Sequence, residues 1–599
     1  ADLDNDGDLD LVVNNLNDKA GLFRNHAADQ GPYHFLKVKL MGSPLNPDGI
    51  GVRAELYTDG KRQVLENHLS RGWLSGINLR QLHFGLGTNE RIDSLTIRWP
   101  DGKRQTWYDL PVNFALDARY EEANFITDPA PKNTIPWLKD VTAASGINFK
   151  HLEVFHNDFA AEQLLPHLLS AEGPKLAVAD VNSDGLEDFF IGGGRGQAGA
   201  LYLQQENQNS PFRKTQDAPF KEHLSNEDIG AAFFDADQDG DADLYVASGG
   251  SEYSGGSALR DRLYLNDGNG GFTYAPDALP TMEINSSCVV PFDLNEDGKM
   301  DVFIGNRSIP LQYGLPGVSK FLLNEGNGRF LDATVKLLEK GGRIGMVTDA
   351  VWIDERKELV VVGEWMPVTI YSFLEGNIRR DTLPNTAGWW NAVEVTDIDG
   401  DSDRDILLGN LGINTSLSAS TDQPLELYVK DYDMNLSTDP IMVYFKNGKQ
   451  WVYPDLDLLS KQIVGVKNTY RSYERFAQKT FTEIFPKEQR EKSFRAQVQV
   501  LESGILKYDG DYAFQPLPEL AQIAPIYGMA VDDFDGNGKT DLLVGGNCYG
   551  NTPSIGRSDA SYGECFEVSE NGQLIARNST ETGFAVIGQI RDIKILSGA

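Results

Sequence analysis

Six acidic segments of one form, DxDxDGxxD or a close variant, recur along the chain. They start at Asp2 (DLDNDGDLD), Asp180 (DVNSDGLED), Asp235 (DADQDGDAD), Asp293 (DLNEDGKMD), Asp397 (DIDGDSDRD) and Asp533 (DFDGNGKTD). A seventh segment, DYDMNLSTD from Asp431, lacks the glycine. Oxygen-bearing side chains at positions 1, 3, 5 and 9, with glycine at position 6 for a sharp turn, suit a hard cation that gathers six or more oxygen ligands. The segments therefore predict bound Ca²⁺.

The residues that follow these segments exclude a helical calcium motif. An EF-hand places a bidentate Glu at position 12 and a helix on either side of the loop. Position 12 is apolar here, occupied by Val13, Ile191, Val246, Ile304, Leu408, Met442 and Val544. The loops are therefore expected to join β-strands. One such loop alone would more often be a solvated acidic turn, but six or seven in register favour calcium.

The composition of the chain limits the fold class and the kinds of binding partner that can be expected. With 599 residues it is too long for one ordinary core, and its 60 Gly and 27 Pro indicate a turn-rich, all-β protein of two or more domains. A net charge of −34 opposes binding to nucleic acid or anionic membranes, because phosphate binding needs a concentrated basic surface. No run of 18 apolar residues exists, so no transmembrane segment is expected.

The three cysteines are too few for a disulfide framework. Cys548 and Cys565 flank one loop between two strand-like runs, where they would either pair or stay free, and Cys288 is expected to be a buried small hydrophobe. The sequence opens inside an acidic repeat, so we expect a fragment of a longer protein whose signal segment is not included.

The spacing of the acidic segments predicts a propeller. Each is flanked by apolar strands and followed by a Gly-rich loop and further strands, as in residues 176–203. A repeat of about 40 to 60 residues with four short strands is typical of a propeller blade. A degenerate blade is expected around Asp354, and the Asp431 loop is interpreted as a second hairpin inside the Asp397 blade. This gives six blades, and GQIRDIKILSGA at the end would open a seventh.

Four regions are predicted along the chain. Residues 1–30 would be the last blade of another propeller, residues 33–120 a small β-sandwich without acidic loops, and residues 121–135 a polar linker. Residues 136–599 would form the main propeller of about seven blades. Apolar residues at helical spacing predict a helical insertion at about 453–490, interpreted either as a stabilising lid or as a partner-binding helix.

Specific motifs carry a family resemblance. Residues 33–120 resemble the ASPIC/UnbV domain through GIGVRAEL, SRGWLSG, LHFGLG and LTIRWPDGKRQTW, and the blades resemble the FG-GAP or VCBS repeats of integrin-type propellers. The order of these parts is similar to that of the large VCBS-repeat proteins of Bacteroidetes, and a related arrangement occurs in animal cartilage acidic proteins. The resemblance implies a metal-binding, extracellular interaction protein.

The resemblance also implies a set of calcium ligands. They are Asp2, Asp4, Asp6 and Asp10; Asp180, Asn182, Asp184 and Asp188; Asp235, Asp237, Asp239 and Asp243; Asp293, Asn295, Asp297 and Asp301; Asp397, Asp399, Asp401 and Asp405; Asp431, Asp433, Asn435 and Asp439; and Asp533, Asp535, Asn537 and Asp541. Ser402 and Leu436 stand where the family has glycine, and the hairpin after Asp354 lacks the full set. The expectation of bound calcium is weakened least by Ser402, more by Leu436, and most at the hairpin after Asp354.

In integrin-like propellers the calcium hairpins lie on one face, and ligands usually bind to the loops on the other. Recognition surfaces are typically rich in aromatic and Arg side chains on rigidly mounted loops. The corresponding loops here hold Arg195, Tyr253, Arg307, Tyr313, Trp365, Asn410, Asn414, Tyr549, Arg557 and Asp559. Two interpretations stay open: these residues bind a ligand, or they cap the central channel.

The leading functional hypothesis is a non-enzymatic protein of the cell surface or outer membrane, or a secreted one, that recognises a glycan or a protein partner. One alternative is a polysaccharide lyase or another glycan-degrading enzyme, with His151, His156 and His167 as its only histidine cluster. A lead-in segment, residues 151–167, that packs on the first blade would explain these histidines as well. A further alternative is an accessory subunit of an outer-membrane nutrient-uptake complex.

Overall fold

A computed structural model of the protein describes residues 2–4, 6–15, 17–69, 81–125, 135–206, 211–215, 218–338, 341–374, 377–569 and 572–597. The chain forms two compact units, Ala1–Thr134 and Ile135–Ala599. Residues 126–134 of the predicted linker lie outside the described residues, and so does the motif SRGWLSG at 70–76.

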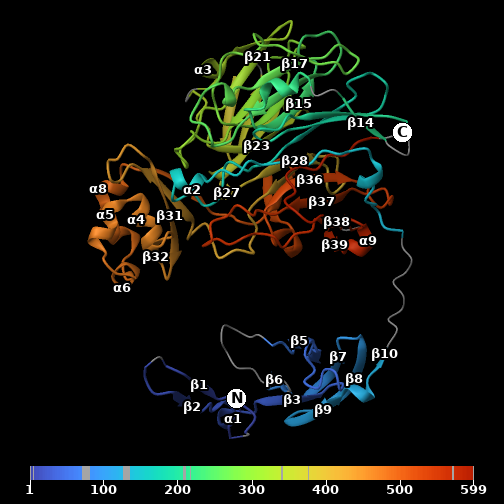
Figure 1. Ribbon diagram of the computed structural model, residues 1–599, viewed down its shortest axis with the longest axis vertical. Coiled ribbons are helices and arrows are strands. Elements are labelled where there is room, and N and C mark those ends of the chain that lie inside the picture. Colours follow the sequence, from blue (N-terminus) through green and yellow to red (C-terminus); the bar gives the residue numbers. More distant parts are fainter. Residues whose placement is uncertain are drawn as a thin grey trace. The chain divides into compact units, whose positions relative to one another are not determined.

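The first unit, blue in Figure 1, is built around a sandwich of two sheets. One sheet has the strand order β10-β8-β7-β4-β5 and the other β6-β3-β9, in which β3 and β9 are parallel. The strands are β3 (His34–Met41), β4 (Arg53–Thr58), β5 (Lys61–Glu66), β6 (Gln81–Gly87), β7 (Arg91–Arg98), β8 (Lys103–Pro111), β9 (Phe114–Arg119) and β10 (Asn124–Phe125).

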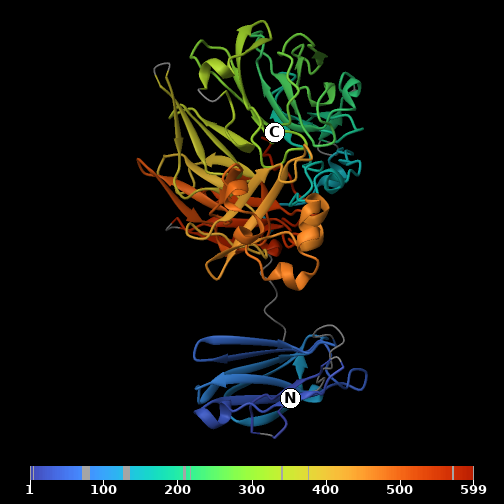
Figure 2. The ribbon, with the colours of Figure 1, turned by 90° about the vertical axis from the view of Figure 1, so that its left-hand side faces the viewer.

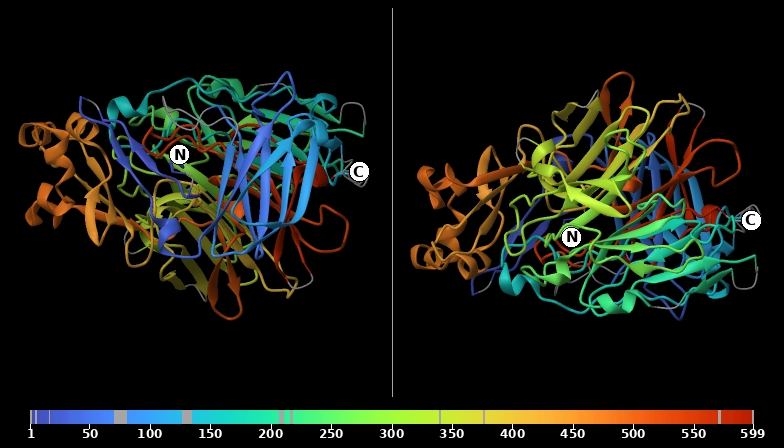
Figure 3. Two further views of the ribbon diagram at one scale, coloured as in Figure 1. Left: turned by 90° about the horizontal axis from the view of Figure 1, so that it is seen from below. Right: turned by 90° about the horizontal axis from the view of Figure 1, so that it is seen from above.

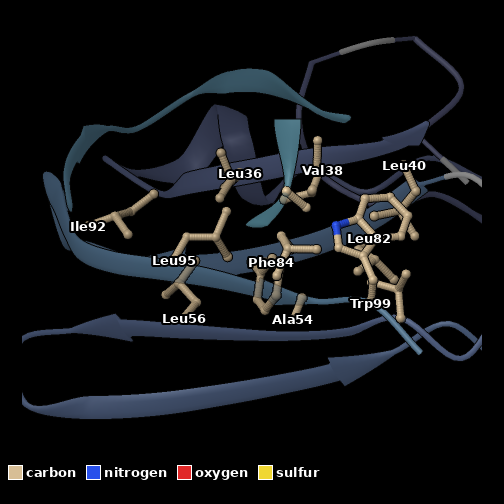
Figure 4. Packing of buried hydrophobic residues seen from close by; sticks show 14 of the residues in the cluster. Leu36, Val38, Leu40, Ala54, Leu56, Leu82, Phe84, Ile92, Leu95 and Trp99 are labelled. Carbon is tan, nitrogen blue, oxygen red and sulfur yellow. The ribbon is translucent and has the colours of Figure 1, made fainter. Parts of the chain in front are cut away.

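Alternation of side chains explains why these segments form strands. In β6 every second residue is buried, including Leu82 and Phe84, while the residues between them are more exposed. A period of two places one set of side chains on the core face of a sheet. Figure 4 shows Leu36 of one sheet and Leu95 of the other in the same apolar cluster.

A short hairpin precedes the sandwich within this unit. Strand β1 (Leu11–Val13) pairs with β2 (Gly21–Phe23), and helix α1 (Ala27–Gln30) follows. The acidic loop before β1 packs on β3, because Lys37 contacts Asp2 and a side chain on Gly7 would collide with the ring of Phe35. The described part of this region thus contains a two-stranded sheet, and its acidic loop lies against the sandwich.

Seven sheets lie along the second unit in its described residues, six of them in the ring of the propeller and one inserted within the fifth. Sheet 1 comprises β11 (Leu176–Ala179), β12 (Asp188–Ile191), β13 (Ala200–Gln204) and β14 (Phe212–Lys214), and sheet 2 comprises β15 (Asp228–Phe234), β16 (Asp243–Ser248), β17 (Arg262–Leu265) and β18 (Thr273–Tyr274). Sheet 3 comprises β19 (Ser286–Phe292), β20 (Asp301–Asn306), β21 (Lys320–Gly326) and β22 (Arg329–Asp332).

Sheet 4 comprises β23 (Met346–Ile353), β24 (Glu358–Met366), β25 (Thr369–Leu374) and β26 (Asn377–Thr382), with β27 (Gly388–Trp389) also paired to β24. Sheet 5 comprises β28 (Ala392–Thr396), β29 (Asp405–Gly409), β34 (Gly504–Tyr508) and β35 (Tyr512–Pro516). Sheet 6 comprises β36 (Ile526–Asp532), β37 (Asp541–Gly546), β38 (Glu564–Val568) and β39 (Leu574–Arg577).

The first strands of these sheets surround a common axis. Strand β11 lies beside β15, β15 beside β19, β19 beside β23, β23 beside β28, and β28 beside β36. In Figure 2 the sheets succeed one another in colour order around the unit. Antiparallel four-stranded sheets arranged in this way form a β-propeller, so the predicted fold is confirmed.

The Asp431 loop belongs to a separate sheet. Strands β30 (Leu425–Lys430), β31 (Asp439–Lys446), β32 (Lys449–Val452) and β33 (Phe494–Val498) have the order β32-β31-β30-β33 and fall between β29 and β34 in the chain. We interpreted this loop as a second hairpin inside the Asp397 blade. The third and fourth strands of that blade instead come after the insertion. The Asp431 loop therefore belongs to an additional sheet, which the short spacing between the two loops did not indicate.

Five short helices complete the insertion, where the sequence predicts helices. They are α4 (Leu456–Gln462), α5 (Val464–Thr469), α6 (Tyr473–Ala477), α7 (Phe481–Ile484) and α8 (Lys487–Arg490). Leu459 and Phe481 are fully buried against Ile441 and Val443 of β31. In both views of Figure 3 these orange helices project from one side of the unit.

Other helices are single turns. They are α2 (Asp158–Ala161), α3 (Thr334–Leu337) and α9 (Ser579–Thr582), with 3₁₀ turns at Tyr120–Glu122, Thr142–Ala144, Phe220–His223, Ser257–Leu259 and Glu519–Gln522.

The C-terminal segment 584–597 closes the ring between sheets 6 and 1. The carboxylate of Asp592 accepts a hydrogen bond of 2.9 Å from the backbone N–H of Leu176 in β11. The N–H of Ile590 donates to the carbonyl of Gly546 in β37 at 2.9 Å. We expected this segment to open a seventh blade, but its described residues contain no strand.

Small residues make room for this closing segment. A Cβ on Gly545 would come within 2.5 Å of Ile590, and a Cβ on Gly528 would come within 2.9 Å of Ile593. The start of the unit joins the same region, because the N–H of Leu138 donates to the carbonyl of Thr582 at 2.8 Å. Both ends of the second unit therefore contribute to closing the propeller.

Removing one apolar contact of the closing segment should weaken the propeller. Ile590→Ala deletes a half-buried side chain that packs on β37, and we expect it to lower the free energy of unfolding by about 2 kcal/mol in chemical denaturation. Ile587, whose side chain is 87% exposed, provides the control, because Ile587→Ala should leave stability unchanged. Equal effects of the two substitutions would contradict this account of closure.

Candidate functional site

The acidic loops of the propeller lie at one end of the sheets. Those that start at Asp180, Asp235, Asp293, Asp397 and Asp533 each join the first strand of a sheet to its second. We call this end the hairpin face. The loops from the second strand to the third, and from each sheet to the next, lie at the opposite end, the loop face. The Asp431 loop likewise joins the neighbouring strands β30 and β31 of the inserted sheet.

All seven acidic loops share one turn geometry. In each, the carboxylate at position 1 accepts a hydrogen bond of 2.8–3.2 Å from the backbone N–H at position 6. The glycines at position 6 have positive φ, and Ser402 (φ 77°) and Leu436 (φ 73°) adopt the same left-handed conformation. The two departures from glycine therefore leave the fold of the loop unchanged.

The aspartate at position 9 anchors each loop in the protein. All seven of these residues are at most 7% exposed: Asp10, Asp188, Asp243, Asp301, Asp405, Asp439 and Asp541. In six loops the carboxylate accepts a hydrogen bond of 2.7–3.1 Å from the N–H at position 2. In sheet 1 its other oxygen accepts from the N–H of Gln204 in the third strand at 2.7 Å, and Asn266 and Asn324 play the same part in sheets 2 and 3.

The electrostatics of these aspartates disfavour a free negative charge. Burial, together with the neighbouring carboxylates of the loop, raises the pKa of Asp243 to about 7. The same causes raise the pKa of Asp188, Asp301 and Asp541 to about 6. A buried carboxylate normally requires a positive partner or a full set of hydrogen bonds.

The structure brings the predicted ligands together. Carboxylate oxygens lie within 4.8 Å of one another in five groups: Asp2, Asp4 and Asp6; Asp235, Asp237 and Asp239; Asp397, Asp399 and Asp401; Asp431, Asp433 and Asp439; and Asp533, Asp535 and Asp541. Buried oxygens of Asp2, Asp405, Asp433 and Asp541 have no hydrogen-bond partner within the part of the chain that the structure describes. In the two remaining loops the position-3 amides Asn182 and Asn295 contact Asp184 and Asp297. The donor sets therefore fit an oxygen-preferring divalent cation.

Basic side chains neutralise part of the charge in some loops. Lys299 contacts Asp297 at 2.9 Å, Lys507 contacts Asp399 at 2.6 Å, and Arg24 contacts Asp4 at 2.8 Å. In sheet 4 the shortened hairpin pairs Asp354 with Lys357 at 2.7 Å. That hairpin has an internal counter-charge for Asp354, whereas the described residues give the Asp180, Asp235 and Asp533 loops no ion pair.

A buried polar network occupies the loop face. Glu364 at the end of β24 accepts hydrogen bonds from Arg307 (2.7 Å) and Tyr313 (2.8 Å), and it contacts His167 Nε2 at 2.7 Å. The indole N–H of Trp365 donates to the Tyr313 hydroxyl at 2.8 Å. Arg307, Tyr313 and Trp365, all predicted ligand-binding residues, are at most 5% exposed. Arg307 Nη2, the Tyr313 hydroxyl and the Trp365 indole N–H are therefore engaged inside the protein.

The charges in this network stabilise one another. Burial alone would raise the pKa of Glu364, but Arg307 and His167 hold it well below its usual range. Burial alone would lower the pKa of His167, yet the charge and hydrogen bond of Glu364 raise it to about 9. The site consequently holds a carboxylate and two cations at neutral pH. Sequence reasoning missed Glu364, although a lone acid within the apolar run VVVGEWM was the available signal.

The network lies at the mouth of the central channel. Arg307 and His167 line a cavity of about 50 Å³. A second cavity, of about 220 Å³, is bordered by the first strand of every sheet, through Leu176, Ala231, Val289, Ala350, Val393 and Met529. This position agrees with the interpretation that these residues cap the channel.

The other predicted ligand residues are distributed around the loop face. Asn410 is buried and donates to the carbonyl groups of Val500 and Glu502, whereas Asn414 is exposed and donates to Ile523. Arg557 lies 3.7 Å over the ring of Tyr549 and pairs with Asp559 at 3.0 Å. Arg195 lies 3.4 Å from Glu252, and Tyr253 is half-buried in the same loop as Glu252. Asn414, Arg557 and Asp559 are the exposed members of the set.

The three lead-in histidines do not share a site. His151 contacts Glu153 at 2.7 Å, His156 lies 3.6 Å from Asp158, and His167 joins the Glu364 network. The three cysteines are buried free thiols, so Cys548 and Cys565 do not form a disulfide.

The fold and its repeated acidic hairpins define a protein of the repeat-propeller class. Residues 42–125 match the family described as ASPIC and UnbV, and residues 180–246 and 247–304 match the FG-GAP-like repeat. The chain is therefore an FG-GAP-repeat protein with an ASPIC/UnbV domain. A comparison with curated proteins gave no match. No helix in the described part of the chain is long and apolar enough to span a bilayer.

Three solved structures show distant similarity. One is described as an Agrocybe aegerita lectin that recognises non-reducing terminal N-acetylglucosamine, with 11% identity, TM-score 0.33, and coverage of 74% of this chain and 89% of that one. The Dos1 propeller has 8% identity, TM-score 0.26 and coverage of 53% and 71%. Chaetomium thermophilum Sqt1, bound to the N-terminus of ribosomal protein L10, has 10% identity, TM-score 0.30 and coverage of 72% and 80%.

The Glu364 network should make stability depend on alkaline pH. Because the pKa of His167 is about 9 in the folded protein and about 6.5 when unfolded, the folded state binds this proton more tightly. The resulting stabilisation, on the order of 3 kcal/mol, is complete below about pH 6.5 and is lost as the pH rises through 9. We expect His167→Gln to flatten the fall in unfolding free energy across this window in denaturant titrations.

His223 provides the control for this titration. Burial lowers the pKa of His223, so it is largely neutral in both states above about pH 7.5, and His223→Gln should leave the slope unchanged there. An identical pH profile for His167→Gln and the parent protein would contradict the role of His167.

Proposed function

We propose that the protein is a non-enzymatic, calcium-stabilised binding protein that acts at the cell surface or in the extracellular space and recognises a glycan or a protein partner on its loop face. The observation that carries the proposal is the common geometry of the seven acidic loops. Each combines a left-handed residue at position 6 with a buried aspartate at position 9. Extracellular modules bind calcium at about 0.1 to 1 mM, a level available outside the cell.

Calcium would be held by the side chains at positions 1, 3, 5 and 9 of the loops. When bound, it supplies positive charge and oxygen coordination, and so offsets the repulsion within each acidic cluster. The hydrogen bonds from the N–H groups at positions 2 and 6 orient the carboxylates at positions 9 and 1. The protein itself therefore preforms the loop. Calcium binding would further stabilise its attachment to the third strand through the aspartate at position 9.

Calcium removal should destabilise the propeller. At about 1 mM calcium, a site with a Kd of about 0.1 mM adds about 1.4 kcal/mol to stability. We expect EDTA to lower the melting temperature, and Asp237→Ala, which removes the position-3 oxygen ligand, to reduce the calcium-dependent rise and the number of bound ions by one. Asp267→Ala is the control, because Asp267 lies in an exposed turn that caps only Asn269 and Gly271. A melting temperature that EDTA leaves unchanged would contradict the calcium proposal.

The loop face offers a site for a partner. A hollow of about 690 Å³ lies between the lead-in and C-terminal segments, lined by residues that include His151, Glu153, Phe584, Val586, Ile587 and Gln589. Sites for small ligands usually measure about 300 to 1,000 Å³ and combine apolar walls with a few polar groups. The side chain of Gln589 also accepts a hydrogen bond from the N–H of Tyr549 at 2.8 Å, which places the Tyr549–Arg557 pair beside this hollow.

A binding screen with matched arginine variants tests this site. The parent protein is passed over immobilised neutral and acidic polysaccharides and over membrane extracts, with calcium and with EDTA. For a retained partner we expect Arg557→Ala to weaken binding about 10-fold or more, as at a hot spot. Arg379→Ala is the control, because Arg379 is an exposed arginine paired with Asp381 at 2.8 Å, on β26. Release of unsaturated sugars would show a lyase instead, and equal binding by both variants would place the site elsewhere.

A further inference from the structure

An acidic pair is buried on the loop face, away from the acidic hairpins. Glu227 directly precedes β15, and Glu252 lies in the loop between β16 and β17. Both positions are at the loop-face end of sheet 2. Glu227 is 3% exposed, and the side chain of Glu252 is 2% exposed. Neither residue belongs to a DxDxDG segment or to the Glu364 network.

The two carboxylates converge on the backbone of Gly250. A Cβ placed on this glycine would lie 2.4 Å from Oε2 of Glu252 and 2.7 Å from Oε2 of Glu227. The positive φ of Gly250, 94°, also disfavours any other residue at this position. Glycine therefore keeps open a space that two carboxylate oxygens border.

The protein offsets the charges of this pair only in part: Arg195 and His156 partly balance the charge of Glu252, whereas the described residues give Glu227 no ion pair. Neither oxygen of Glu227, nor Oε1 of Glu252, has a hydrogen-bond partner among the described residues. Arg195 lies 3.4 Å from Glu252, but its Nε makes no hydrogen bond. Burial and the charges of Glu252, Glu153 and Glu172 act together to raise the pKa of Glu227. An unpaired buried carboxylate of this kind is costly unless another group neutralises it.

We propose that Glu227 and Glu252 bind a divalent cation of the calcium class at a site separate from the acidic hairpins. The donors that border the space are carboxylate oxygens, which hard cations prefer. Glu153 of the lead-in segment contributes a third negative charge that acts on Glu227. A cation here would join the loops of sheet 2 to the lead-in segment that crosses the loop face, and it would offset the repulsion between the buried acids.

Calcium titration of the full chain tests the site. Glu227→Gln and Glu252→Gln keep the side-chain shape but remove a charge, and each should eliminate one bound calcium ion per chain in calorimetric titration. Glu283→Gln is the matched control, because Glu283 is an exposed acid paired with Arg260 at 2.6 Å near the same loop. It should retain the full number of ions. Titration with Mg²⁺ in place of calcium should give weaker binding at this site.

Melting experiments separate cation binding from a shared proton. In EDTA, Glu227→Gln should be at least as stable as the parent, because the substitution removes repulsion between buried acids. In calcium, its melting temperature should rise less than that of the parent. Unchanged calcium stoichiometry in both glutamine variants would overturn the proposal and favour a proton shared by the pair. Loss of an ion in Glu227→Gln but not in Asp237→Ala would keep this site while refuting the hairpin site of the Asp235 loop.

Discussion

The buried aspartate at position 9 of each acidic loop is the interaction on which the propeller depends. In sheet 1 the side chain of Asp188 accepts a hydrogen bond from the turn and another from the third strand, and so links three parts of the blade. A carboxylate buried in this way costs free energy unless its charge is offset. In the proposed function, the residue that fixes the architecture also creates the demand for a cation, so fold and ion binding would be coupled.

The opposite end of the propeller meets a similar demand with the protein's own cations. Glu364 is buried as deeply as the position-9 aspartates, but Arg307 and His167 contact it directly. His167 comes from the lead-in segment and Glu364 from sheet 4, so this ion pair fixes the segment over the channel. Much of the loop face is thereby covered by the chain itself, and the proposed recognition would be confined to its remaining exposed rim and hollow.

The sequence predicted the repeated elements well because their signals are local. A turn of fixed spacing between apolar strands identifies the hairpins, and the period-two pattern of segments such as β6 identifies the sandwich strands. The roles of Arg307 and Tyr313 could not be predicted, because their burial results from a partner, Glu364, that is more than 50 positions away in the chain. The inserted sheet was missed for a related reason, since β29 pairs with a strand that follows about 95 residues later, at β34.

The distribution of charge favours the proposed placement of partner recognition on the loop face. The net charge of −34 is concentrated in part on the hairpin face, where five of the loops each present several carboxylates. Even with divalent ions bound, loops such as the one from Asp235, with its four ligand aspartates and the additional Asp241, would keep negative charge. Approach of an anionic partner is therefore least opposed at the loop face, where Arg557 is exposed beside Tyr549. Because Arg557 is already paired with Asp559, the proposed site would suit a neutral glycan or a polar peptide better than a polyanion.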